Sequence, residues 1–185
     1  MTVTDVNVVK SAIFERPDDA NKGTLGSLLC VCGSYGMAGA AVMSAKGALR
    51  TGIGLAKCAL PRSIYPIVAQ TILESVYYPL SENADGRISK VNVPFLVSES
   101  CKSSATLVGC GLGVCDDTLK IVFSFIENST TPLVLDADAL NCVAKQPEIL
   151  LRKKAPIIIT PHPGEMSRLT GLATPLVNAE RERVA

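Results

Sequence analysis

The sequence contains few aromatic residues, a single histidine and no excess of either charge. Its 185 residues include no Trp, four Phe and four Tyr, and the formal net charge is +1. A nucleic-acid-binding domain needs a basic surface, or aromatic side chains on which bases stack, and this composition favours neither. We therefore expect no nucleic-acid partner.

Segments that direct a chain into or across a membrane are also lacking. Residues 1–10 contain no apolar run of the signal-peptide type, and no apolar run approaches the roughly 20 residues that span a bilayer. The seven cysteines include no C-x-x-C pair, and their odd number argues against a disulfide framework. We interpret them as reduced thiols, mostly in the core, of a cytoplasmic protein without a membrane partner.

Two nucleotide-binding fingerprints are absent as well. No G-x-G-x-x-G is followed by an acidic residue ~20 positions on, which argues against a nicotinamide dehydrogenase, and no G-K-[ST] completes a Walker A motif. What the sequence has is apolar side chains: 48% of the residues are hydrophobic and 19% are charged, so disorder is not expected.

Short apolar runs alternate with helical patterns along the chain. Strands are predicted over residues 25–32, 53–60, 74–78, 105–108, 133–135 and 157–160. Helices are predicted over 5–14 and 38–50, from Pro61, from Asp116 or Asp117 as cap, and from Thr174 as cap. This order predicts an α/β fold, a mostly parallel sheet with helices on both faces.

Two of these elements carry expectations about burial. The consecutive isoleucines Ile157–Ile159 have no polar alternation and predict a strand buried on both faces. In the helix that begins at Pro61, we expect Ile64, Ile67 and Val68 to form the apolar face.

Small or polar residues follow four of the predicted strands. The first turn, with Gly33, Ser34 and Gly36, leads into a helix, where backbone N–H groups suit an anion; a tight turn without a ligand is the alternative. In the second turn, Gly109, Gly111 and Gly113 alternate and allow a ligand to approach the backbone, although a packing turn explains them nearly as well.

The other two turns carry acidic residues, an amide and the histidine. We expect Asp136 to face a crevice, whereas Asp138 either caps the helix that begins there or takes part in the site. His162 and Glu165 follow the isoleucine strand, and a proline-rich turn with a surface histidine is the alternative. Because carboxyl ends of parallel strands meet at one sheet edge, we expect the four turns to form one ligand site.

Six blocks of the sequence, in this order, resemble the ADP/ATP-dependent NAD(P)H-hydrate dehydratases. The similarity extends from about residue 20 to the last residue, and its most specific blocks are the last two. The blocks are Lys22–Gly26, Gly33–Ala40, Ala48–Gly54, Gly109–Gly113, Leu135–Asn141 and Thr160–Glu165.

This resemblance implies a ribokinase-like three-layer sandwich and a lyase. Such enzymes repair hydrated NADH or NADPH (NADHX, NADPHX) by phosphorylating the ring hydroxyl and then eliminating it, with ADP or ATP as co-substrate and Mg²⁺. The resemblance also implies roles for particular residues. The expected substrate-binding residues are Ala40, Gly111, Asp136, Asn141 and His162, and the expected phosphate or anion loops contain Gly33, Ser34, Gly36 and Gly113.

Glu165 is similar to the second polar position of the ribokinase-type N-x-x-E motif, and we expect it to contact Mg²⁺ through water. The family also has a lysine-glycine nucleotide segment and a Gly-x-Gly-Asp whose Asp is the expected base, and residues 166–185 match neither. We therefore expect one α/β domain over residues 1–185 that is incomplete relative to the family, with the base lying beyond Ala185.

Two other functions stay open. One is a ribokinase-like kinase that phosphorylates a small alcohol such as a thiazole or a pyrimidine, and the Pro161–Glu165 block argues against it. The other is an inactive, truncated dinucleotide-binding fragment. We also expect a homo-oligomer.

Overall fold

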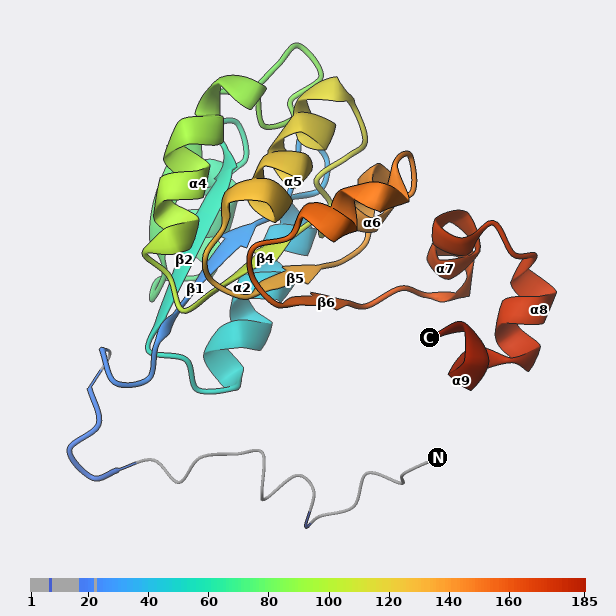
Figure 1. The fold of residues 1–185 in the computed structure, drawn as a ribbon. Helices are drawn as coiled ribbons and strands as arrows, with labels where there is room; N and C mark the ends of the chain where they lie inside the picture. Colours follow the sequence, from blue (N-terminus) through green and yellow to red (C-terminus); the bar gives the residue numbers. More distant parts are fainter. Residues whose placement is uncertain (1–6, 8–16, 22) are drawn as a thin grey trace.

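Figure 1 shows the computed structural model of the chain, which describes residues 7, 17–21 and 23–185. Within them lies a six-stranded sheet in which every neighbouring pair is parallel, in the order β3-β2-β1-β4-β5-β6. This confirms the predicted α/β fold with a parallel sheet. The strands are β1 (Ser27–Val31), β2 (Leu55–Pro61), β3 (Val76–Leu80), β4 (Ala105–Val108), β5 (Leu133–Leu135) and β6 (Ile157–Ile159).

Helices cover both faces of this sheet, as predicted. On one face, α4 (Val93–Cys101), α5 (Asp116–Asn128) and α6 (Asp138–Val143) contribute to a core with β1, β4 and β5. On the other face, α2 (Ala38–Arg50) packs on β1 and β2, and α3 (Tyr65–Thr71) packs on β3. The result is three layers, with the sheet in the middle (Figure 1).

The remaining helices are short. Two 3₁₀ helices span Lys90–Asn92 and Pro147–Arg152. After β6 the chain extends away from the main body into α7 (Pro163–Thr170), α8 (Thr174–Ala179) and α9 (Arg181–Val184), as Figure 1 shows. In the part of the chain that the structure describes, no helix has the length and apolar character to cross a bilayer.

One row of paired residues crosses the sheet on the face that α2 and α3 occupy; we call it the transverse row. Its members, in register, are Cys58, Cys30, Leu107, Val134 and Ile158. The two cysteines are buried, Leu107 and Val134 are half-buried, and Ile158 is 61% exposed. The prediction that the isoleucine strand is buried on both faces is therefore wrong, because α2 and α3 lie over β1, β2 and β3 rather than over β6.

Sequence patterns located α2 to the residue and missed α4. The helix α4 has little apolar periodicity because Glu99 and Ser100 are among its three buried residues. The Glu99 carboxylate is held by Lys102 at 2.8 Å and by the Tyr78 hydroxyl at 3.0 Å. A prediction based on the spacing of apolar residues therefore missed this helix, because two of its buried side chains are polar.

Three details of the predicted helices are corrected. Ile67 is 56% exposed, because only Ile64 and Val68 of the predicted face turn toward the sheet. The N-cap of α5 is Cys115, with the two aspartates in the first turn, and the N-cap of α8 is Ala173. The helix predicted over residues 5–14 lies outside the described residues, apart from Asn7.

Candidate functional site

The strand order reverses between β1 and β4, and two of the predicted turns follow these two strands. In parallel sheets, ligands bind outside the carboxyl ends of the strands at such a reversal, because the connections diverge there to opposite faces. β5 and β6 continue the sheet beside β4, so all four predicted turns follow consecutive neighbouring strands. With a spacing of about 4.8 Å between strands, the ends of β1 and β6 lie about 14 Å apart.

The turn after β1 uses most of its polar groups inside the protein. The N–H of Gly33 donates to the Cys110 carbonyl at 2.8 Å, and the N–H of Tyr35 donates to the Gly86 carbonyl at 2.9 Å. The buried Ser34 hydroxyl donates to the Gly111 carbonyl at 2.8 Å. The bonds of Gly33 and Ser34 join the turn to the one after β4, and that of Tyr35 joins it to the loop after β3. Gly36 is left as the open part of the predicted anion loop.

The turn after β4 is packed against its neighbours so closely that side chains are excluded. A Cβ on Gly109 would lie 1.9 Å from the Asp136 carbonyl oxygen, and one on Gly111 would lie 2.6 Å from the Cβ of Ala40. Both glycines also have positive φ, a conformation that other residues rarely adopt. The structure therefore brings together Ala40 and Gly111, two of the predicted substrate-binding residues.

Asp136 joins the ends of three strands. Its Oδ1 accepts a hydrogen bond from the Thr160 hydroxyl at 2.7 Å, and its Oδ2 accepts one from the Cys110 thiol at 3.2 Å. Its own N–H donates to the Val108 carbonyl at 3.1 Å. Asp136 is half-buried and is held at the sheet edge by Cys110, which follows β4, and Thr160, which follows β6.

Ala137 has an unusual backbone conformation that sequence reasoning missed. Its φ of 50° is the one positive value among the non-glycine residues that the structure describes. Such a conformation costs on the order of 1–3 kcal/mol and persists where the surroundings impose it, often at functional sites. Here it separates Asp136, which faces Thr160 and Cys110, from Asp138, which faces the glycine turn.

Asp138 does not cap α6, because the N-cap is Ala137. Instead, its Oδ2 accepts a hydrogen bond from the N–H of Gly113 at 2.8 Å, and its Oδ1 accepts one from Asn141 at 3.3 Å. The amide oxygen of Asn141 in turn accepts a hydrogen bond from Arg168 at 2.9 Å. Arg168 is a site-associated residue that no sequence motif indicated.

His162 and Glu165 form a reciprocal cap at the start of α7. The N–H of His162 donates to Glu165 Oε2 at 2.9 Å, and His162 Nδ1 accepts from the N–H of Gly164 at 3.0 Å. The proton of a neutral ring is therefore on Nε2, which lies 3.2 Å from Glu165 Oε1. The imidazole side chain is 62% exposed while the carboxylate is buried, so His162 presents its ring face outward.

Cys110, one of the seven cysteines that were expected mostly in the core, lies instead at the candidate site. It is half-buried, with its thiol on Asp136. A hydrogen bond from the Cys32 thiol lowers the pKa of Cys110, while burial and the Asp136 carboxylate act in the opposite direction. Its place after a strand, between two glycines, is the signal that could have identified it.

The side chains described do not by themselves make a magnesium site. Both Glu165 oxygens are engaged by His162, and within residues 7, 17–21 and 23–185 no cluster of three or more His, Cys, Asp or Glu side chains could hold a metal. Mg²⁺ bound to proteins also takes ligands from water and substrate phosphates, so the contact through Glu165 stays a prediction.

A cavity of about 430 Å³ lies between the end of β6 and the C-terminal helices. It adjoins the candidate site at Thr160 and Pro161, whereas the glycine turns are not part of its wall. We take the turns and Asp136 as the candidate site, because hydrogen bonds and close backbone packing hold these groups together. The cavity is lined by Ile159, Thr160, Pro161, Pro163, Met166, Val177, Arg181, Val184 and Ala185.

Comparison with known sequences identifies related proteins over nearly the whole chain. A family model described as NAD(P)H-hydrate dehydratase matches residues 28–185. The bifunctional NAD(P)H-hydrate repair enzyme of Thermofilum pendens is 37% identical over 166 residues, which cover 90% of this chain and 32% of that protein.

Comparison with solved structures gives the same fold. The ADP/ATP-dependent NAD(P)H-hydrate dehydratase of Bacillus subtilis, co-crystallised with ATP/Mg²⁺, has a TM-score of 0.76 at 27% identity, covering 97% of this chain and 59% of that one. A ribokinase-like protein of Enterococcus faecalis has a TM-score of 0.75 at 20% identity, covering 92% and 58%. The predicted ribokinase-like fold is thus confirmed. The chain spans about a third of the first relative and just over half of the other two.

Proposed function

Because the chain belongs to the NAD(P)H-hydrate dehydratase family, we propose that it binds NADH or NADPH hydrated on the nicotinamide ring and takes part in the nucleotide-dependent dehydration that repairs them. The observation that carries this proposal is the junction of four turns at the carboxyl ends of β1, β4, β5 and β6, beside the reversal of strand order. A ligand there meets close-packed backbone, one carboxylate and one imidazole.

Four of the five predicted substrate-binding residues have a chemical role in this proposal. Because Gly111 has no side chain and Ala40 only a methyl group, a flat ring can lie close to the backbone there. Asp136, already oriented by Thr160 and Cys110, accepts hydrogen bonds from the substrate's hydroxyl or amide groups. His162 offers its exposed ring face for stacking.

The reaction that we propose has two steps. Phosphoryl transfer from ADP or ATP to the ring hydroxyl makes phosphate the leaving group; the C–O bond then breaks, the adjacent carbon loses a proton and the ring double bond is restored. Bound with the nucleotide, Mg²⁺ would neutralise charge on the phosphates. Among residues 7, 17–21 and 23–185 we assign no catalytic base. Support for the nucleotide comes from the Bacillus subtilis relative, whose structure was obtained with ATP/Mg²⁺.

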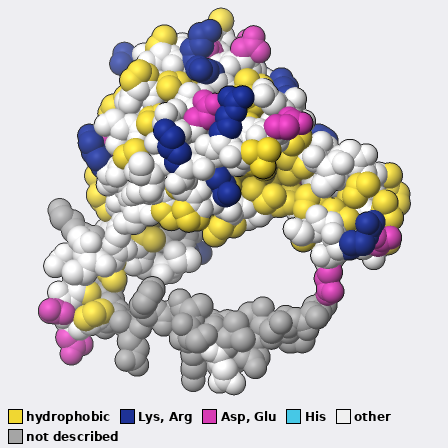
Figure 2. Space-filling model, in the orientation of Figure 1, with side chains coloured by type: hydrophobic (Ala, Val, Ile, Leu, Met, Phe, Trp, Pro, Cys, Tyr) yellow, Lys and Arg dark blue, Asp and Glu magenta, His cyan; other side chains and the backbone are white. Residues whose placement is uncertain are grey.

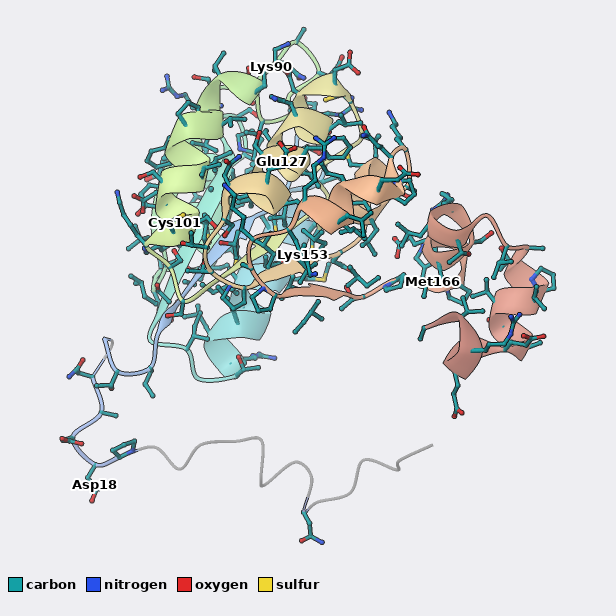
Figure 3. All side chains as sticks on the ribbon, viewed as in Figure 1. Asp18, Lys90, Cys101, Glu127, Lys153 and Met166 are labelled. Atoms are coloured by element: carbon teal, nitrogen blue, oxygen red, sulfur yellow. The ribbon has the colours of Figure 1, made fainter. Side chains whose placement is uncertain are left out.

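Calorimetric titration of the chain with hydrated NADH tests the binding part. We expect saturable binding that Asp136→Asn weakens about tenfold, because a charged hydrogen-bond acceptor contributes about 1.5–3 kcal/mol. The matched control is Asp18→Asn, a carboxylate on the N-terminal segment far from the sheet edge (Figure 3), which should bind like the unchanged chain. Absence of saturable binding would reject the proposal.

A turnover assay tests the reaction part. With Mg²⁺ and ADP or ATP, we expect the full natural polypeptide to restore the absorbance of the reduced nicotinamide, with the Bacillus subtilis dehydratase as positive control. Binding without turnover would restrict the function to dinucleotide binding. Phosphorylation of a thiazole or pyrimidine alcohol, with none of the hydrate, would replace the proposal by a small-molecule kinase.

Two expectations from the sequence belong to this proposal and are tested separately. A homo-oligomer would have a molar mass by light scattering that is a multiple of the 19.5 kDa chain. A cytoplasmic location would be seen by fractionating cells that express the full natural polypeptide.

A further inference from the structure

We infer that Asp138, Asn141 and Arg168 act as positioning residues that set the spacing between the glycine turn after β4 and the helix α7, which begins after His162. We call the chain of hydrogen bonds from Gly113 through these residues the relay. The effect of the relay on substrate binding rests on the proposed function. The coupling of the glycine turn to α7 does not depend on that function.

Three hydrogen bonds define the relay. The N–H of Gly113 donates to Asp138 at 2.8 Å, the amide nitrogen of Asn141 donates to Asp138 at 3.3 Å, and Arg168 donates to the amide oxygen of Asn141 at 2.9 Å. The relay therefore joins three segments: the turn after β4, the first turns of α6, and α7. Along the chain, α5 and β5 separate the turn after β4 from α6, and the second 3₁₀ helix and β6 separate α6 from α7.

Only one orientation of the Asn141 amide satisfies both of its neighbours in the relay. A carboxylate can only accept hydrogen bonds and a guanidinium can only donate them. The Asn141 amide between them must therefore turn its nitrogen toward Asp138 and its oxygen toward Arg168, because a flipped amide would set acceptor against acceptor and donor against donor. Each end of the relay is thus a charge-assisted hydrogen bond, which is stronger and more directional than a neutral one.

This geometry gives Asn141 a role different from the one that the resemblance implied. Each polar end of its amide makes a hydrogen bond within the protein, so Asn141 aligns other groups in addition to any contact with the substrate. The groups that it aligns lie at the ends of the relay. Gly113 is two residues from Gly111, which packs against Ala40, and Arg168 is on the helix that His162 caps.

Arg168 is exposed, and a solvent-exposed hydrogen bond from a charged side chain to a neutral amide contributes little to stability. Its loss should therefore change ligand binding more than unfolding, provided that the relay controls where α7 lies. This difference separates a positioning role from a merely structural one. A matched control is available in Arg152, an exposed arginine that pairs at 2.9 Å with Glu127, which is in the last turn of α5, at the end opposite the glycine turn.

The first experiment measures the free protein, so it does not depend on any substrate. We expect Arg168→Met and Asp138→Ala each to speed amide hydrogen exchange at Gly113, and Arg152→Met to leave it unchanged. If exchange at Gly113 is the same in all three variants and the unchanged chain, the relay does not couple the two segments.

The second experiment exchanges two relay members. Asn141→Asp alone sets two carboxylates against each other, and we expect it to weaken calorimetric binding of hydrated NADH about tenfold or more. Combining it with Asp138→Asn restores an amide beside a carboxylate, with every donor again facing an acceptor, and should recover most of the affinity. Arg168→Lys should bind more tightly than Arg168→Met.

The outcomes separate the two proposals. If the unchanged chain binds no hydrated NADH but exchange at Gly113 responds as expected, the proposed function fails and the coupling stands. If the chain binds the hydrate and the double exchange binds no better than Asn141→Asp alone, or Arg168→Met binds like Arg152→Met, the positioning role is wrong.

Discussion

The two halves of the sheet are similar in sequence and different in burial. In the half formed by β1 and β2, Cys30 and Cys58 of the transverse row are buried beneath α2 and α3. In the half formed by β5 and β6, the same row ends at Ile158, which is 61% exposed. An uninterrupted apolar sequence thus shows which side chains of a strand can be buried. The placement of the helices decides which of them are covered.

The difference extends to the surface and to polar contacts. Figure 2 shows hydrophobic side chains gathered where the main body meets the C-terminal helices. At the other end of the sheet, the half-buried Lys57 of β2 lies 3.8 Å from the Glu99 carboxylate, so α4 is attached to β2 and β3 by charged and polar groups. The covered half is therefore held by both apolar packing and ion pairs.

The largest expected effect concerns the packed turn between the two halves. Gly109→Ala would place a methyl group 1.9 Å from the Asp136 carbonyl oxygen at a φ of 126°, so the backbone must move. We expect a loss of unfolding free energy of more than about 4 kcal/mol, or failure to fold. Urea denaturation followed by circular dichroism measures it.

Gly36→Ala is the control for that substitution. Its φ is 83°, and nothing lies within 4 Å of the added Cβ, so only backbone strain of about 1–2 kcal/mol is expected. Equal losses at the two glycines would mean that close packing of the turn after β4 is not what excludes side chains there.

A large-to-small pair compares a fully buried strand position with the exposed end of the transverse row. Leu29 of β1 is fully buried, so Leu29→Ala should cost about 2–5 kcal/mol of unfolding free energy. Ile158→Ala on β6 should cost only about 0.5 kcal/mol, since the side chain is already mostly exposed. Chemical denaturation of both variants checks this, and a cost at Ile158 as large as at Leu29 would show that β6 is covered in solution.

The pH dependence of stability tests the charged attachment of α4. The hydrogen bond from Lys102 lowers the pKa of Glu99 below its ordinary value of 4.5, with help from Tyr78 and despite burial. Because the folded-state pKa is the lower one, the stabilisation is present above pH 4.5 and is lost as the pH falls through the lowered pKa.

We therefore expect the unfolding free energy of the unchanged chain to fall more steeply below pH 4.5 than that of Glu99→Gln. The effect is smaller than the preceding ones, since partly solvated pairs contribute at most about 1 kcal/mol. Parallel curves for the two proteins would show that the ion pairs do not stabilise the fold.

The smallest effect involves no change in stability. Burial raises the pKa of Cys30 and Cys58, whereas a hydrogen bond that Thr130 donates to the exposed Cys101 lowers the pKa of that thiol. Since the thiolate is the reactive form, Cys101 should react with a maleimide well before either row cysteine. Mass spectrometry of labelled peptides reads the order, and Cys101→Ser should remove the fast phase. Rapid labelling of Cys30 would contradict the burial of the row.

Much of the fold was predictable because it depends on local chemistry. Glycine or proline bounds the apolar runs of β4, β5 and β6, and these strands were predicted near their observed limits. The helix Ala38–Arg50 was predicted to the residue, because its small, helix-favouring residues end at Thr51-Gly52. The four turns were also predictable, since parallel strands bring their carboxyl ends to one edge. The helix α4 was not, because its buried Glu99 and Ser100 are stabilised by partners far away in sequence.

By itself, the sequence determined the alternation of strands and helices, and with it the edge at which Ala40, Gly111, Asp136 and His162 would be found. Only the tertiary structure decided the orientation of the side chains at that edge: Asp136 toward Thr160, Asp138 toward Gly113, and Asn141 toward Arg168. The physical reason is range. Strand and helix preferences arise within a few residues, whereas each of these hydrogen bonds joins residues 24 or more positions apart in the sequence.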